Sequence, residues 1–183
     1  MTLETGRLLL RRPRLADAPE LFGFLGDAEA MRYTLRFASP RDCRRHIAAH
    51  ERQRRRVGCA PWVVSSRADG GRRIVGYGGL YEDPFDRGWG IEVGYFFARW
   101  AWGRGYATEL TRFCLDVARE RLGLAEVAAF AHPDNAASRR VLEKAGFEVE
   151  RFVPAMGRYL YRRRLAHLSG RSGRTAGRAG SSR

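Results

Sequence analysis

Cysteine is scarce in this chain of 183 residues. Cys43, Cys59 and Cys114 are an odd number of widely separated residues, with no C-x-x-C pair among them. A disulfide or zinc framework needs more cysteines at closer and more regular spacing. We therefore expect three reduced thiols, as is usual in a cytoplasmic protein.

Long apolar runs are absent as well. No window of about 18 uncharged apolar residues occurs, so we expect no transmembrane helix and no membrane partner. The first residues, MTLETGRLLLRRP, contain no apolar stretch long enough for a secretory signal. Both observations favour a cytoplasmic location.

A metal-binding motif is also missing. His46 and His50 have the i, i+4 spacing that places two side chains on one helix face, but Ile-Ala-Ala lies between them. The glutamate of an H-E-x-x-H site is therefore absent, and we expect no bound metal.

Lysine is nearly absent, although the net charge is +14. Only Lys144 among the 34 basic residues is a lysine, and residues 162–183 hold seven arginines and no acid, which is half of the net charge. We expect one folded domain over residues 1–167 and a disordered Arg/Gly/Ser-rich tail over 168–183. The tail is compatible with a weak nucleic-acid contact or with no partner at all.

The rest of the composition is that of an ordinary folded domain, with 44% hydrophobic and 30% charged residues. Alternating and β-rich runs predict seven strands, at 7–12, 61–67, 73–82, 89–97, 126–131, 147–152 and 158–165. Helical periodicity predicts helices that end near 25 and that span 40–56, 106–122 and 136–145. This order predicts an α+β fold with a central mixed sheet, antiparallel first and partly parallel later.

Helix boundaries carry recognisable end signals. Asp17 and Glu20 have the spacing of a capping box at the start of the first helix. Ser39 followed by Pro40 predicts the start of the second helix, and Gly146 predicts the end of the last one.

The segment 94–109, GYFFARWAWGRGYATE, has the strongest chemical signal. A predicted strand leads into a loop with Gly103 and Gly105, and a long predicted helix follows at once. Such a loop turns its N–H groups toward phosphate oxygens, although an ordinary glycine-rich connection would have the same composition. The segment matches neither G-x-x-x-x-G-K-[ST] nor G-x-G-x-x-G, which excludes an NTPase P-loop and a dinucleotide-binding fingerprint.

A second segment, HPDNAASRRVLEKAGF at 132–147, makes the pattern specific. W-G-R-G-Y-A-T-E together with N-x-x-S-x-x-V-L-E-K-A-G-F resembles the two cofactor motifs of the GCN5-related N-acetyltransferase (GNAT) superfamily. Among its members the sequence is most similar to the ribosomal-protein-alanine N-acetyltransferases, which share T-x-R-L-x-L-R at 5–11. The resemblance covers about residues 3–165. It implies the GNAT fold, a mostly antiparallel twisted sheet of about seven strands flanked by about four helices.

The resemblance also implies a cofactor site for acetyl-CoA. The loop Gly103, Arg104, Gly105, Tyr106, Ala107 and Thr108 would hold the pyrophosphate through its N–H groups. Trp102 stands where the superfamily has Gln or Arg, which removes a side-chain donor and leaves the backbone donors. The backbone of Tyr95, Phe96 and Phe97 would pair with the pantetheine arm, and Asn135 would bind that arm near the thiol.

Catalytic residues are less clearly marked. The position at which many members of the superfamily carry a tyrosine acid is Leu142, so Ser138 would stabilise the leaving thiolate instead, unless it only completes the first helical turn. Glu92 alternates with apolar neighbours on a strand between two glycines, which favours a general base in a cleft. There are alternatives for Glu92: it could lie at a solvated strand edge or contact the substrate ammonium. The base could also be His132, or the amine could lose its proton to water.

We therefore expect an N-acetyltransferase that moves the acetyl group of acetyl-CoA to a primary amine by direct attack in a ternary complex, without an acetyl-cysteine. The acceptor would be a protein N-terminus or a small-molecule amine, and the protein a monomer or a homodimer. The alternative is a catalytically weak acetyl-CoA-binding module associated with the ribosome or RNA through its basic tail. Most of a set of aromatic residues should belong to the core, and one or two of them would line the amine site. The set is Tyr33, Phe37, Trp62, Tyr77 and Tyr81.

Overall fold

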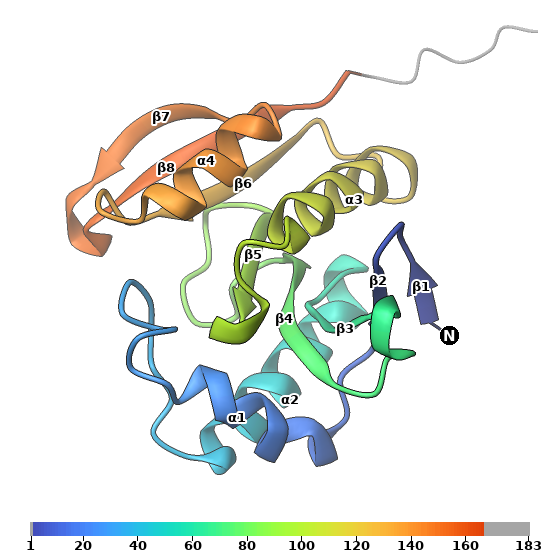
Figure 1. Cartoon of the computed structure of the whole chain (residues 1–183). Helices are drawn as coiled ribbons and strands as arrows, with labels where there is room; N and C mark the ends of the chain where they lie inside the picture. The colour runs from blue at the N-terminus through green and yellow to red at the C-terminus, as the bar shows by residue number, and fades with distance from the viewer. Residues whose placement is uncertain (1, 167–183) are drawn as a thin grey trace, which may run out of the picture.

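One sheet of eight strands runs through residues 2–166, the part of the chain that the computed structural model describes (Figure 1). The strands lie in the order β1-β2-β3-β4-β5-β6-β8-β7. Their bounds are β1 Thr2–Glu4, β2 Leu8–Arg11, β3 Trp62–Ser66, β4 Ile74–Tyr81, β5 Glu92–Phe97, β6 Glu126–Ala131, β7 Glu148–Val153 and β8 Arg158–Arg164. The α-helices are α1 Ala18–Leu25, α2 Pro40–Val57, α3 Tyr106–Glu120 and α4 Ala136–Lys144, and the 3₁₀ helices are η1 Leu15–Asp17, η2 Arg67–Asp69, η3 Arg99–Ala101 and η4 Pro154–Met156.

The predicted α+β class and mixed sheet are confirmed. Strands β1 to β5 pair antiparallel in turn, β5 and β6 are parallel, and β8 pairs antiparallel with both β6 and β7. The additional strand is β1, in which Thr2–Glu4 pairs with residues 9–11 of β2. Three residues are too short to show a period of two, so the sequence pattern missed this strand.

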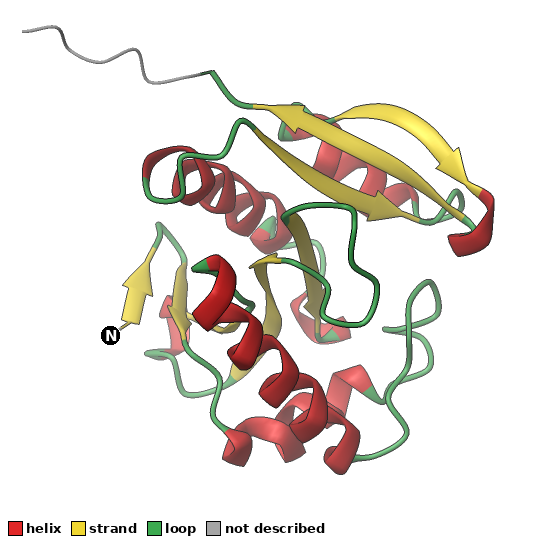
Figure 2. Ribbon diagram, turned by 180° about the vertical axis from the view of Figure 1, so that it is seen from behind, coloured by secondary structure: helices red, strands yellow, loops and turns green. Residues whose placement is uncertain are grey.

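Helices cover both faces of the sheet. Leu110 of α3 packs on Val64 and its neighbours on one face, where α4 also lies, and Leu21 of α1 packs with Val63 on the other. Adjacent residues of a strand point to opposite faces, so Val63 and Val64 belong to two separate cores. The view from behind in Figure 2 brings α2, which lies with α1, to the front of the sheet.

The predicted capping box at the first helix is wrong. The Asp17 carboxylate accepts the Arg14 N–H at 2.6 Å and pairs with Arg11 at 2.8 Å, and it does not cap α1. The carboxylate of Glu20 accepts the Ile74 N–H at 2.7 Å and thereby joins α1 to β4. Nearby arginines thus hold the Asp17 carboxylate, and a distant strand holds the Glu20 carboxylate, so neither caps the helix.

The other two end signals are confirmed. The Ser39 hydroxyl accepts the N–H of Asp42 at 3.3 Å, and Pro40 is the first residue of α2. At the end of α4, Gly146 has a φ of +79°, the left-handed conformation that stops a helix.

Strand β5 begins at Glu92 and not at Trp89, because the preceding loop continues to residue 91. The Asp83 carboxylate accepts the N–H groups of Phe85 at 2.7 Å and Asp86 at 3.3 Å, which turns the chain within this loop. Trp89 then lies against Phe130 of β6, with ring centroids 5.3 Å apart. Trp89 of the loop thus packs against the second half of β6.

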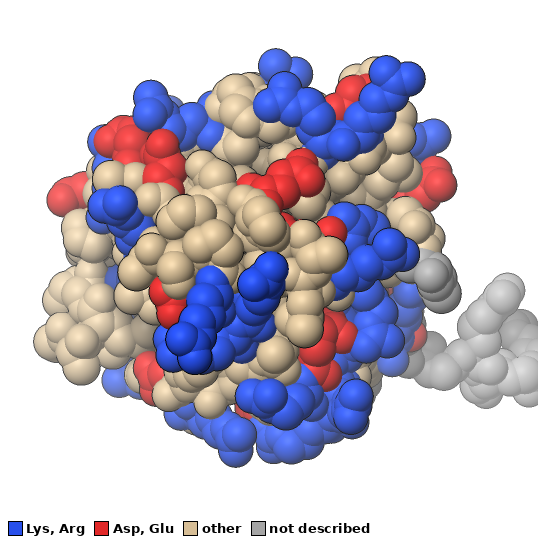
Figure 3. All heavy atoms as spheres, turned by 90° about the horizontal axis from the view of Figure 1, so that it is seen from below, with Lys and Arg blue, Asp and Glu red and all other residues tan. Residues whose placement is uncertain are grey.

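Charge on the described part of the surface is mixed. Figure 3 shows the underside of the molecule, with Lys and Arg side chains over much of it and Asp and Glu side chains among them. No helix within residues 2–166 is both long enough and apolar enough to cross a membrane. The predicted tail at 168–183 lies outside the described residues, and its lack of structure stays a prediction.

Candidate active site

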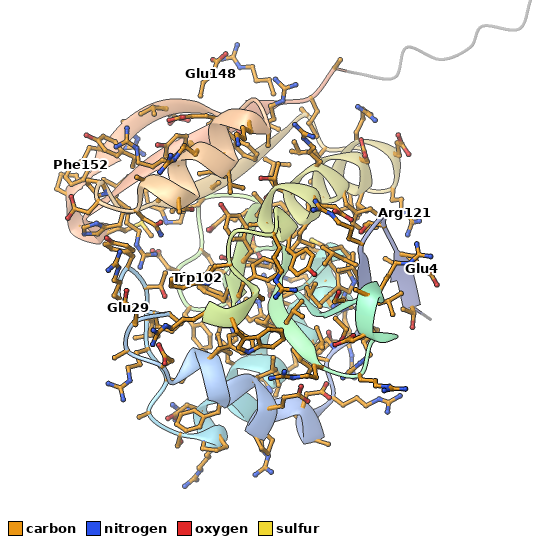
Figure 4. All side chains as sticks on the ribbon, in the orientation of Figure 1. Glu4, Glu29, Trp102, Arg121, Glu148 and Phe152 are labelled. Carbon is orange, nitrogen blue, oxygen red and sulfur yellow. The ribbon has the colours of Figure 1, made fainter. Side chains whose placement is uncertain are left out.

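A cleft of about 530 Å³ lies between β5, the end of β6 and the first turns of α3 and α4. Its volume is in the range of ligand-binding pockets. Trp102, before α3, and Glu29, after α1, both line it, and Figure 4 shows the two on the same side of the molecule. The cleft also brings together the other predicted site residues: Glu92, Tyr95, Phe96, Phe97, Gly103, Arg104, Gly105, Tyr106, Ala107, Thr108, Asn135 and Ser138.

The cleft exists because β5 and β6 diverge. They share one recorded residue pair, Glu92 with Ala128, supported by a hydrogen bond from the Ala128 N–H to the Ile91 carbonyl at 2.9 Å. On its other side β5 is paired with β4 along its whole length. Beyond Glu92, therefore, β5 offers an open edge toward β6.

Backbone alternation decides which residues face that edge. Ile91 bonds toward β6, whereas the Ala98 N–H bonds to β4 at 2.9 Å, and successive residues of a strand bond to opposite sides. Tyr95 therefore directs its N–H and C=O to the open edge, and so does Val93, which the sequence argument missed. Phe96 directs its backbone groups to β4, so it is not placed to pair with an added arm, although its ring lines the cleft.

Trp102 forms a hydrogen bond with one of the backbone groups that were expected to bind the cofactor. Its indole Nε1–H donates to the Phe97 carbonyl at 2.9 Å, so this carbonyl already has a partner within the chain. Phe97 is left with its N–H on the open edge, while its ring is buried in the core. The tryptophan thus closes the turn after β5, and its ring lines the cleft.

The start of α3 carries N–H groups without partners in the helix. Gly103 and Gly105 have φ angles of +73° and +74°, the left-handed region that glycine enters without strain. Gly105 is the N-cap, no side chain of the described residues caps it, and the first backbone bond of the helix runs from the Glu109 N–H to its carbonyl at 3.1 Å. The N–H groups of residues 106–108 are therefore available to an anion.

Arg7 fixes the direction of this loop. Its guanidinium donates to the Arg104 carbonyl at 2.5 Å and to the Gly105 carbonyl at 3.4 Å. Because a trans peptide points its C=O and N–H in opposite directions, the Gly105 and Tyr106 N–H groups point away from Arg7. The sequence did not indicate this role of Arg7, because Arg7 lies about a hundred residues before the loop.

Glu109 of α3 holds Arg7 in place. Its carboxylate accepts from the Thr5 hydroxyl at 2.5 Å, the Arg7 N–H at 2.7 Å and the Arg7 Nε–H at 2.6 Å. Partial burial would raise the pKa of Glu109, but these hydrogen bonds and the positive charge of Arg7 lower it below the ordinary value. The carboxylate therefore stays ionised and anchors the N-terminal turn to α3.

Glu92 is a buried carboxyl group at the wall of the cleft. It is only 6% exposed, so the predicted alternative of a solvated edge is wrong. Burial raises its pKa to about 8, with further contributions from the negative charges of Asp83 and Asp86. A carboxyl group with such a pKa is suited to accept a proton from an amine at about pH 8 and above, where it is ionised.

Three polar side chains meet at the start of α4. The Asn135 Oδ1 accepts the Ser138 N–H at 3.0 Å and caps the helix, so the Ser138 hydroxyl is not needed for capping. That hydroxyl lies 3.0 Å from the hydroxyl of Tyr95. Burial raises the pKa of Tyr95 to about 12. The sequence argument assigned Tyr95 a backbone role only, and nothing in the strand pattern indicated its hydroxyl.

Leu142 is a core residue and not a defective catalytic one. It is 1% exposed, packs in the core under α3 and is not part of the cleft lining described above. Hydroxyl groups reach the cleft from Ser138 and Tyr95 instead. Of the aromatic residues considered for the amine site, Tyr33 and Tyr81 line the cleft.

His132 lines the cleft too, with one nitrogen already used. Its ring stacks on Tyr33 at 5.1 Å, and its Nδ1 accepts the Asp134 N–H at 3.2 Å. In the neutral ring Nε2 therefore carries the proton, and no free nitrogen lone pair is left to accept one, which makes Glu92 the better candidate for a base.

Basic side chains gather at the cofactor end of the cleft. Arg140 and Lys144 of α4 line it together with Arg104 of the loop. Residues 140 and 144 are one helical turn apart and share a face, so both suit additional phosphate groups. The sequence argument missed them, although a basic i, i+4 pair after the motif asparagine was a visible signal.

Metal ligands do not cluster in the described residues. Within residues 2–166 no group of three or more His, Cys, Asp or Glu side chains could hold a metal ion. His46 and His50 lie with ring centroids 4.3 Å apart, and burial lowers their pKa values to about 4 and about 3.

Comparison with known families gives one family model. The model of the acetyltransferase (GNAT) domain matches residues 7–148. A relative from Bacillus subtilis (strain 168), named uncharacterized protein YkkB, is 32% identical over 152 residues, which are 82% of this chain and 87% of the relative.

Solved structures share the fold. The acetyltransferase from Agrobacterium tumefaciens superposes with a TM-score of 0.78 at 23% identity, over 90% of this chain and 95% of that one. The ribosomal L7/L12 α-N-protein acetyltransferase RimL in complex with coenzyme A superposes with a TM-score of 0.70 at 16% identity, over 90% and 98%. At these identities the likeness concerns the fold.

Gly105→Glu should weaken binding of acetyl-CoA by more than about tenfold, because a carboxylate at the anion site opposes a diphosphate and a side chain at positive φ is strained. A Cβ there would also come within 3.0 Å of Arg7. Calorimetric titration with acetyl-CoA measures the affinity. Gly123→Glu is the matched control, since Gly123 also has a positive φ but follows α3 in open space. Equal affinity of the two variants would contradict the assignment of the loop.

Proposed function

The chain belongs to the GNAT acetyltransferase family, and we propose that it transfers the acetyl group of acetyl-CoA to a primary amine by direct attack in a ternary complex. Acetyl-CoA is the acetyl donor of the family. The observation that carries the proposal is the single cleft in which an uncapped helix start, an open strand edge and a buried carboxyl group lie together.

The donor half of the cleft suits a molecule with a diphosphate and an amide-bearing arm. The N–H groups of residues 103–108 would hold the diphosphate, as the partial positive charge of a helix start favours. The open edge of β5 at Val93 and Tyr95 would pair with the amides of the arm, as an added strand would. Arg140 and Lys144 would bind the remaining phosphate.

Glu92 would remove the proton from the attacking amine. An ammonium group cannot attack a thioester, so the nitrogen must lose a proton before or during attack. The carboxylates of Asp83 and Asp86 line the cleft, and they raise the pKa of Glu92 more than the nearby Arg158 and Arg162 lower it. This balance favours a cationic acceptor over an anionic one. Tyr33, Tyr81 and Trp89 add aromatic walls to the cleft.

Ser138 would stabilise the other product of the reaction, the CoA thiolate. Its hydroxyl lines the cleft in the first turn of α4, where the helix start also favours negative charge. Asn135 would bind the arm through its Nδ2, because its Oδ1 caps the helix.

The cysteines do not suit a covalent acetyl-enzyme. Cys43, Cys59 and Cys114 are buried, none is part of the cleft lining within residues 2–166, and burial raises the pKa of each thiol. A protonated, buried thiol is a poor nucleophile. Direct attack by the amine is therefore favoured.

The acceptor classes that we propose are protein N-termini and small-molecule amines. RimL, one of the structural neighbours, acts on the α-amino group of a ribosomal protein, and it shares the fold with this chain. An RNA-associated module without activity is not favoured, since Leu142 lies in the core and the hydroxyls of Ser138 and Tyr95 face the cleft.

The purified protein should release free CoA thiol from acetyl-CoA when it is given the correct amine. The panel consists of peptides with different N-termini, polyamines, amino acids and aminoglycosides, each with a blank that lacks the acceptor. Release above the blank with one class identifies the acceptor, and mass spectrometry should find an acetyl group on its nitrogen. Saturable acetyl-CoA binding without release for any amine would contradict the proposed transfer.

Glu92→Gln should lower kcat/KM about a hundredfold or more above pH 8, because general-base catalysis contributes about 10²–10⁴-fold. In the wild type, kcat/KM should rise with pH through a midpoint near 8, the pKa of Glu92, and this inflection should be missing from the variant. The assay should use an acceptor whose ammonium pKa is near 10, so that the amine ionises at a higher pH than Glu92 and the two inflections are separate.

Stability provides the control for this variant. The pKa of Glu92 is raised on folding, so ionising it costs stability as pH rises from about 4.5 to about 8. The neutral glutamine removes this cost, and Glu92→Gln should be at least as stable as the wild type at pH 8 in thermal unfolding. A stable variant with an unchanged pH profile would contradict the role of Glu92.

A further inference from the structure

A pair of hydroxyl groups bridges β5 and α4 where β5 and β6 have diverged. The Tyr95 hydroxyl lies 3.0 Å from the Ser138 Oγ and 3.4 Å from the Ser138 carbonyl oxygen. Tyr95 is three residues beyond Glu92, at which β5 and β6 are paired, and Ser138 lies in the first turn of the helix that follows β6. Both side chains line the cleft.

We propose that Tyr95 is a positioning residue for Ser138: it donates to the Ser138 Oγ, so that the proton of Ser138 is directed at the sulfur of the thioester. This inference rests on the proposed function and adds a residue to its thiolate site. A hydroxyl group has one proton and can accept further hydrogen bonds. When the Tyr95 hydroxyl donates the proton that lies between the two oxygens, the Ser138 hydroxyl proton must point elsewhere. A hydroxyl group that accepts one hydrogen bond is also a stronger donor in its own hydrogen bond.

Ser138 is held from two sides, which leaves its hydroxyl little choice of direction. Its N–H donates to the Asn135 Oδ1 at 3.0 Å, and its Oγ meets Tyr95. With Tyr95 as the donor between the two oxygens, the Ser138 hydroxyl proton is free to point into the cleft that both residues line. The start of α4 adds a partial positive charge at the same place.

The bond changes define what this pair does. The amine nitrogen forms a bond to the acetyl carbon, and the carbon–sulfur bond breaks with its electron pair passing to sulfur. The amine proton goes to Glu92, and the thiolate takes its proton from water as it leaves. Ser138 donates a hydrogen bond to the sulfur while its negative charge develops, as preorganised donors do in other sites.

Tyr95 keeps its proton throughout. Burial raises its pKa to about 12, well above the value of about 8.5 for an ordinary thiol, so the transfer of a proton to the thiolate is unfavourable. The hydroxyl therefore stays protonated and able to donate a hydrogen bond at neutral and mildly alkaline pH. Leu142, in the core, supplies no competing donor.

A double-mutant cycle with Tyr95→Phe and Ser138→Ala tests the coupling. Tyr95→Phe should lower kcat about tenfold, Ser138→Ala by at least as much, and the double variant no further than Ser138→Ala alone, with an unchanged KM for acetyl-CoA. Tyr77→Phe is the matched control, because the Tyr77 hydroxyl is buried without a partner in the described chain and lies outside the cleft lining. It should leave kcat unchanged. Losses that multiply in the double variant would overturn the proposal.

Titration of bound CoA separates this inference from the proposed function. The ultraviolet absorbance of the thiolate reports the pKa of the bound thiol, and desulfo-CoA provides the blank for the protein. This pKa should be about one unit lower in the wild type than in Tyr95→Phe, which matches a tenfold effect. Equal values would overturn the role of Tyr95 even in an active enzyme. Since no acceptor is present, the titration decides the matter even if no amine is acetylated.

Discussion

The single pairing of Glu92 with Ala128 between β5 and β6 is the constraint on which the site depends. Two parallel strands that stayed paired would bond to each other along their length, and no backbone edge would be left inside the sheet. Because β5 and β6 pair only at Glu92, the edge of β5 toward β6 is free from Val93 onward. The cleft, the helix starts that border it and the buried Glu92 all follow from this divergence.

Charge and hydrogen-bond donors divide the cleft into two ends. Helix α3 begins without a side-chain cap, and Arg7 and Glu109 hold its loop from outside so that the N–H groups point inward. At the other end, burial raises the pKa of Glu92 on β5, and the carboxyl groups of Asp83 and Asp86 in the preceding loop raise it further. An anionic donor and a cationic acceptor would thus meet from opposite ends at the open edge of β5. Tyr95 lies where the two ends meet, with its backbone at the open edge and its hydroxyl next to that of Ser138.

Sequence patterns predicted the four helices, seven of the eight strands and every member of the cofactor loop as cleft residues. Local signals suffice for these because glycine, helix starts and periodicity act within a few residues. The capping pattern failed where other partners compete for the carboxylates, as when Asp17 bonded to the nearby Arg11 and Glu20 to the distant Ile74. Arg7 at the loop and the Tyr95 hydroxyl at Ser138 were missed because only the folded sheet brings these distant pairs together.

The structure of the protein with CoA bound is the most direct test of the central claim, that both halves of the reaction meet at the divergence of β5 and β6. The account predicts the diphosphate on the N–H groups of residues 103–108 and the arm along the open edge of β5. It also predicts the sulfur within hydrogen-bond distance of the Ser138 hydroxyl, with Glu92 across the cleft. A sulfur atom away from Ser138, or an arm that leaves the β5 edge unpaired, would contradict it.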